Sequence, residues 1–187
     1  MITVDDKQLQ YAKDVLQHIP KAAPKAIARA INRARQAGKT AALKKISSEY
    51  TIKQKRISET LDFGKATPNN LSAFIRSTGR PNALSYFKTN PTKIPKGRPK
   101  NPVFVQVKRG GGGTIKSAFL AIMRSGHIGV FNRKSTSSLP ITQHFGPSVP
   151  QMLESKSVTA FICDKAQEVL NERLEHEIDV ILQGVVK

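Results

Sequence analysis

Apolar residues recur at three- and four-residue spacing near both ends of the chain, which predicts amphipathic helices there. Helices are expected over residues 5–19, 25–50 and 158–182, with a shorter one over 53–61 that Thr51 would cap. The apolar stripe of the longest helix comprises Ile27, Ile31, Ala34, Ala41, Ile46 and Tyr50. The apolar stripe of the final helix comprises Ile162, Ala166, Val169, Leu170, Leu174, Ile178 and Ile181, and Glu177 interrupts it. Many alanines in the longest helix favour helix formation and close packing.

The pattern changes to alternation in the middle of the chain, which predicts strands over 71–77, 103–107, 118–123 and 128–132. Residues 84–88 are expected to be extended and 139–141 to form an edge strand. The fold class is therefore α+β, with N-terminal helices, a small antiparallel β-sheet in the middle and a long C-terminal helix. We expect a single domain over 1–187, with a helical part at 1–62, a basic β part at 63–153 and the C-terminal helix at 154–187. Within the β part, the loops at 90–102, which contain four prolines, and at 108–114 are expected to be exposed.

Charge is the strongest feature of the composition. The chain has 31 Lys+Arg against 13 Asp+Glu, a formal net charge of +18. No acidic residue occurs from Phe63 to Leu153, where 14 lysines and arginines lie, whereas the last part, 154–187, is acidic. A folded section without internal counter-charges repels itself, so this pattern indicates a polyanionic partner nearby.

No catalytic or metal-binding constellation is recognisable. His18 and His176 lie on predicted helices without a second ligand at i+4, and no cysteine or carboxylate lies between Phe63 and Pro150, the stretch that contains His127 and His144. Cys163 is flanked by apolar residues and is interpreted as a small core residue. We therefore predict no catalytic residue, no metal, no cofactor and no enzymatic activity. No apolar run is long enough to cross a membrane, and synthesis in a cytoplasm is expected.

Nucleic-acid contact without base reading fits the charge. The sequence has no compact recognition element, so contacts to a phosphate backbone without sequence preference are expected. The glycine run after Lys108-Arg109 lacks the pattern of a nucleotide-binding loop and predicts a flexible hairpin tip. The cations expected to face DNA are Lys96, Arg98, Lys100, Lys108, Arg109 and Lys116.

Several segments in order resemble the minor tail protein Z family of lambda-like phages, also described as tail completion proteins. They are residues 28–34 (Ala-Arg-Ala-Ile-Asn-Arg-Ala), 49–53, 125–131 (Ser-Gly-His-Ile-Gly-Val-Phe), 139–141 and 145–153 (Phe-Gly-Pro-Ser-Val-Pro-Gln-Met-Leu), followed by the acidic final helix. Their glycines and prolines are interpreted as structural because they fix turns. The structural motif residues are Gly126, His127, Gly129, Phe131, Gly146, Pro147 and Pro150.

The resemblance implies a non-catalytic virion protein that completes the head-proximal end of a phage tail at the neck. It implies a homo-oligomeric ring, hexameric by analogy, around the DNA channel. Tail terminator or tail tube proteins and head–tail connector proteins would be its neighbours. The alternative from the charge alone is a free, sequence-nonspecific nucleic-acid-binding protein.

Overall fold

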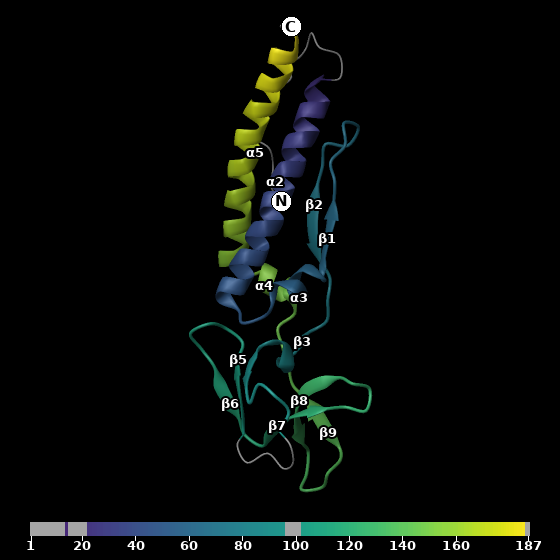
Figure 1. Cartoon of the computed structure of the whole chain (residues 1–187), viewed down its shortest axis with the longest axis vertical. Coiled ribbons are helices and arrows are strands. Elements are labelled where there is room, and N and C mark those ends of the chain that lie inside the picture. The colour runs from purple at the N-terminus through teal and green to yellow at the C-terminus, as the bar shows by residue number, and fades with distance from the viewer. Residues whose placement is uncertain (1–13, 15–21, 96–101, 186–187) are drawn as a thin grey trace. The chain divides into compact units, whose positions relative to one another are not determined.

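The structure, a computed structural model, describes residues 14, 22–95 and 102–185. It has the predicted α+β class, with two long helices and small antiparallel sheets between them in the sequence (Figure 1). The chain divides into two compact units. Unit 1 comprises residues 1–43, 61–77 and 154–187, and unit 2 comprises 44–60 and 78–153. The predicted three-part division of one domain stays a prediction.

Two long helices pack side by side in unit 1: α2 (Ala22–Glu49) and α5 (Lys156–Val185) (Figure 1). Their contact is asymmetric, because α2 contributes mostly alanines, together with Ile27, whereas α5 contributes large side chains. Stacked at four-residue intervals, such rows form the ridges and grooves by which helices interlock. The buried row of α2 is Ala22, Ala26, Ala30 and Ala34, and it packs against Leu170, Leu174 and Ile178 of α5.

Gly38 continues the row of small residues toward a third element of unit 1. A Cβ atom built there would lie 3.1 Å from Ile75 Cδ1 and 3.7 Å from Ala166 Cβ. Ile75 belongs to β2 (Phe74–Ser77), which pairs antiparallel with β1 (Leu61–Gly64). The glycine therefore lets this hairpin and α5 approach α2 at the same point.

Polar contacts hold the hairpin of unit 1 on α2. Asn32 Nδ2 donates to Ala66 O at 2.8 Å, and Ala66 N donates to Asn32 Oδ1 at 3.0 Å, so one side chain satisfies both backbone groups. Lys39 Nζ lies 4.5 Å from the centre of the Phe63 ring.

Glu177, the residue that interrupts the predicted apolar stripe of the final helix, forms an ion pair across the two helices. Its carboxylate lies 3.2 Å from Arg29 Nη1. Because the arginine side chain is 62% exposed, the pair contributes at most about 1 kcal/mol to stability.

In the described part of unit 2, short strands form three separate antiparallel sheets. One contains β4 (Lys88–Asn90), β5 (Val103–Gln106) and β6 (Gly113–Ile115), and another contains β7 (Ala118–Ile122), β8 (Ile128–Arg133) and β9 (Ile141–Gln143). The third pairs β3 (Asn82–Ala83) with β10 (Phe145–Gly146). The remaining elements are α3 (Gln54–Ser58), the 3₁₀-helix η1 (Leu84–Tyr86) and α4 (Val149–Leu153).

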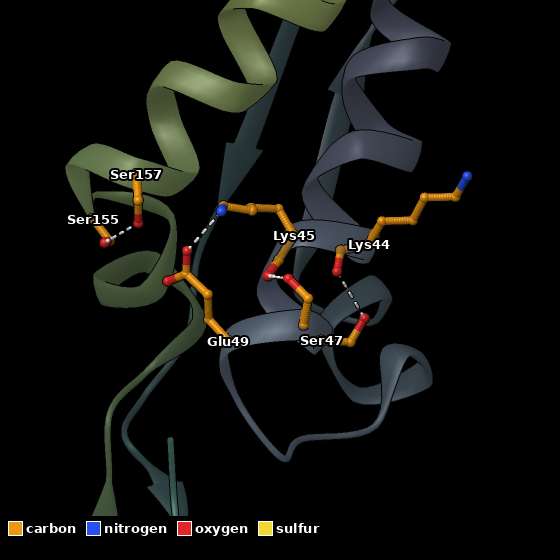
Figure 2. A network of polar contacts seen from close by, with 7 residues as sticks. Lys44, Lys45, Ser47, Glu49, Ser155 and Ser157 are labelled. Atoms are coloured by element: carbon orange, nitrogen blue, oxygen red, sulfur yellow. Dashed lines mark hydrogen bonds and ion pairs between the residues drawn. The ribbon is translucent and has the colours of Figure 1, made fainter. Parts of the chain in front are cut away.

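The last turn of α2 belongs to unit 2. Lys45 Nζ lies 3.1 Å from Glu49 Oε1, one helical turn away, and Figure 2 shows this contact. The Ser47 hydroxyl donates to Lys44 O at 3.3 Å, and the Ser48 hydroxyl donates to Lys45 O at 2.8 Å. These local bonds compete with continued helix formation and lie where the helix ends.

Thr51 does not cap the following helix, and this prediction was wrong. Its Oγ1 donates to Gln106 O, its amide N donates to Val107 O at 3.0 Å, and Oγ1 accepts from Lys88 N at 3.0 Å. The threonine therefore ties the end of α2 to two strands, and α3 begins without a side-chain cap. Thr51 bonds to the strands instead of capping α3 because the bonds to the strands satisfy three backbone groups, Gln106 O, Val107 O and Lys88 N.

Other differences from the predicted elements concern the middle of the chain. The helix expected over 53–61 is shorter, because Leu61 begins β1, and residues 84–86 form a 3₁₀-turn instead of an extended segment. The edge strand predicted at 139–141 lies two residues later, as β9. The strand at 103–107 was expected to share a sheet with those at 118–123 and 128–132, but it belongs to a different sheet. Cys163 is only half-buried. The helix expected over 5–19 lies outside the described residues, apart from Asp14, which is helical.

The small-residue row of α2 yields a first prediction. We expect Ala30→Leu to lower the free energy of unfolding by about 1–3 kcal/mol, because Ala30 is fully buried against α5 and extra methylenes force a repacking. The same change at the exposed Ala160 of α5 is the control and should shift stability by about 0.5 kcal/mol or less. Urea unfolding followed by circular dichroism measures both; equal stability of the two variants would contradict the packing argument.

Candidate nucleic-acid interface

The positive charge of the chain is concentrated in unit 2. This unit contains 17 lysines and arginines but only two acidic residues, Glu49 and Glu59, which gives a formal charge of +15 out of +18. Both carboxylates are already paired within the unit, Glu49 with Lys45 at 3.1 Å and Glu59 with Arg56 at 3.3 Å. The surplus cations of unit 2 therefore lack internal counter-charges.

Lys108 and Lys116 lie on either side of β6, both exposed. The turn between β5 and β6 is open: Gly110 has φ +80°, and neither Gly110 nor Gly111 has any atom within 4 Å of a built Cβ position. Lys108 Nζ also lies 5.8 Å from the centre of the Tyr50 ring. The structure thus presents two of the predicted cations on one hairpin.

Arg109 lies on the same hairpin but is engaged in holding it. Its backbone N donates to Glu49 O at 2.8 Å and its Nε donates to Ser47 O at 2.9 Å. The guanidinium therefore satisfies a carbonyl at the end of α2, a group that the helix itself leaves unpaired. Arg109 has an anchoring contact in addition to its predicted contact with DNA.

The other three predicted cations, Lys96, Arg98 and Lys100, lie outside the described residues. Two cations that sequence reasoning did not select, Arg133 and Lys134, are exposed at the end of β8. They border a groove of about 1160 Å³ whose floor is β7. The sequence did contain a feature that could have identified these two cations. They directly precede a run of serines and threonines, which predicts an exposed loop.

The residues predicted as structural motifs make close contacts inside unit 2. Gly126 has φ +82° in the turn between β7 and β8, a conformation that favours glycine. His127 Nε2 lies 2.8 Å from Gln143 Nε2 of β9. A Cβ on Gly129 would lie 2.8 Å from the buried Phe131 ring, and one on Gly146 would lie 2.7 Å from the Phe87 ring.

The two prolines of the last motif flank the start of α4. Pro147 O accepts a 3.0 Å hydrogen bond from Asn82 Nδ2, and Pro150 lies in the first turn of the helix. Asn82 is only 2% exposed, and its Oδ1 also accepts from Arg56 Nε at 3.3 Å. This buried asparagine links α3, β3 and the motif loop, and nothing in the local sequence pattern marked it.

The histidines do not form a reactive arrangement within the described part of the chain. There, no group of three His, Cys, Asp or Glu side chains is placed to hold a metal ion. His144 Nε2 is buried without a hydrogen-bond partner among the described residues, and His127 contacts a neutral amide. His176 is exposed on α5, and His18 lies outside the described residues. Among the described residues, none of the helices is long and apolar enough to span a bilayer.

Comparison with known proteins supplies the family. The model of the prophage minor tail protein Z family matches residues 7–187, nearly the whole chain. The chain belongs to this family. The resemblance seen in the sequence motifs is therefore confirmed. No curated protein and no solved structure matches the chain.

Membership gives the protein a structural role in a phage tail and a place in the virion. The family is one of structural tail proteins and is not known as an enzyme family. In this tail protein, the motif at 125–131 contains the first part of β8, the motif at 145–153 contains β10 and α4, and both motifs belong to the same unit as Lys108 and Lys116.

Gly129 yields a second prediction. We expect Gly129→Ala to destabilise unit 2 by about 1–3 kcal/mol, because the new methyl group would overlap Phe131 and approach Gln143 Nε2 at 3.0 Å. Gly113→Ala is the control, since no atom lies within 4 Å of its Cβ position in β6. Urea unfolding followed by tyrosine fluorescence reports mainly on this unit, which contains two of the three tyrosines, Tyr50 and Tyr86. Unchanged stability of Gly129→Ala would show that β8 has room to adjust.

Proposed function

We propose that this tail protein completes the head-proximal end of the phage tail at the neck, as one subunit of a ring around the DNA channel. In this position it supports head–tail connection or the positioning of DNA. The observation that carries the proposal is the charge of unit 2, +15 with both of its carboxylates paired internally. For a tail protein in the virion, the polyanion that we expect is double-stranded DNA.

The placement of the cations favours contacts to phosphates. DNA carries one negative charge per about 1.7 Å of helix axis, so several cations on one surface neutralise it without reading bases. The two helices that lie wholly within unit 2, α3 and α4, have five residues each. The cations Lys108 and Lys116 lie beside a short strand, and Arg133 and Lys134 end another. This arrangement is suited to nonspecific binding, and a recognition helix would be expected for sequence-specific binding.

A ring explains why the charge is tolerated. An isolated subunit with +15 on one unit repels itself, whereas subunits around DNA share an anionic axis. The neighbours proposed for the ring are tail terminator or tail tube proteins on one side and head–tail connector proteins on the other.

The DNA-facing cations yield a third prediction. We expect a combined variant to bind double-stranded DNA more weakly and to lower phage titre without unfolding the protein. It carries Gln in place of five cations: Lys96, Arg98, Lys100, Lys108 and Lys116. Arg109 is retained because it anchors the hairpin. Each lost phosphate contact should reduce the slope of log affinity against log salt by about 0.9. Fluorescence anisotropy over a salt series measures that slope.

The control for this experiment removes the same charge from unit 1, with Gln at the exposed Lys25, Arg33, Lys65, Arg76 and Lys156. It should retain most of the binding. Equal losses in both variants would mean that only total charge matters and would contradict a DNA-facing loop surface.

Location in the particle is a fourth prediction. Immunogold labelling of purified tails and whole virions with an antibody to the chain should place the label at the head-proximal end of the tail. Label along the tail or at its distal tip would refute the neck position. Absence from virions, combined with tight DNA binding by the isolated monomer, would favour the free nucleic-acid-binding protein instead.

A further inference from the structure

The outer face of α5 carries a row of carboxylates. Five acidic residues follow one another at four-, four-, three- and four-residue spacing, which places them on one narrow face of the helix. All five are exposed, and we call this row the acidic stripe: Asp164, Glu168, Glu172, Glu175 and Asp179. The stripe faces away from the buried residues Leu170, Leu174 and Ile178 that pack on α2.

The acidic stripe has few ion pairs within the described part of the chain. In the described part of the chain, only Glu168 among these five residues forms an ion pair, with Lys165 at 2.7 Å. Like charges at i,i+4, such as Glu168 and Glu172, oppose helix formation. At the end of the stripe lies Leu182, which is 37% exposed. The face therefore combines acidic residues with an apolar end.

The groove of unit 2 has the complementary chemistry. Its floor includes Phe119, Leu120 and Ile122, of which Ile122 is 54% exposed, and its border carries Arg133 and Lys134. Among the described residues that line it, none is acidic. Arg133 lies over the Phe119 ring, with its guanidinium carbon 5.3 Å from the ring centre. A phosphate backbone does not require an apolar floor, whereas an amphipathic protein surface does.

We propose that the acidic stripe of α5 docks in the groove of unit 2 of a second copy of the chain. Charge complementarity between the two surfaces, both present in each copy, carries this assignment. One surface binds a different surface of the next copy, so the contact is heterologous and propagates into a ring or a filament. The inference rests on the proposed ring and names the surfaces that join its subunits.

A charge-swap experiment on the full-length chain tests the contact, and it is the fifth prediction. A stripe variant carries Glu172→Lys and Glu175→Lys, and a groove variant carries Arg133→Glu and Lys134→Glu. Wild-type chain should associate at low salt, as measured by sedimentation velocity, and each variant alone should self-associate at least about a hundredfold more weakly because like charges meet. An equimolar mixture of the two variants should associate again, because the introduced lysines of one variant then meet the introduced glutamates of the other.

Two controls match the variants in charge. Lys53→Glu with Lys55→Glu changes exposed cations of unit 2 away from the groove, and Asp62→Lys with Glu154→Lys changes exposed acids of unit 1 away from the stripe. Both should associate like the wild type. Circular dichroism confirms that every variant is folded.

Three outcomes would overturn the docking contact: wild-type chain that stays monomeric, variants that associate normally, or a mixture that stays monomeric. A groove variant that loses only DNA binding would assign the groove to nucleic acid and also overturn it. Immunogold label at the head-proximal tail end together with any of these results would leave the neck role standing and reject only the docking contact.

Discussion

The close approach of α2 and α5 is the interaction on which unit 1 depends. Alanines at every fourth residue of α2 leave a shallow surface, and the leucines and isoleucine of α5 fill it. Gly38 extends that surface to the point where Ile75 of the β1–β2 hairpin arrives. Because the contacts are between small and large side chains, neither helix tolerates a larger residue in the row without moving.

This packing also sets which residues of α5 remain available. With one face of the helix committed to α2, and Glu177 paired with Arg29 at 3.2 Å, the acidic stripe is left on the outside. The opposite imbalance holds in unit 2, where cations outnumber carboxylates 17 to two and both carboxylates are paired internally. The family's structural role in the tail and the two proposed contacts, with DNA and with a second copy, give this separation of charge a common explanation.

Unit 2 depends on side chains that bond to backbone groups far away in the sequence. Thr51 joins the end of α2 to β4 and β5, Arg109 holds the β5–β6 hairpin, and the buried Asn82 bridges to Pro147. Short strands supply few ladder hydrogen bonds of their own, so these contacts stabilise the loops that carry the cations. Changes at anchoring residues would consequently alter the loops as well as the core.

The sequence by itself determined the α+β class, the two long helices, the strands at 103–107, 118–123 and 128–132, and the family, because periodicity and ordered motifs are local properties of the chain. Only the tertiary structure decided that Thr51 bonds to strands instead of capping α3, that Leu61 begins a strand, and that the strands divide among several sheets. It also decided that Arg109 anchors a hairpin, and that Arg133 and Lys134 border a groove. Those outcomes depend on which distant backbone groups and apolar surfaces meet, and spacing along the chain does not encode such contacts.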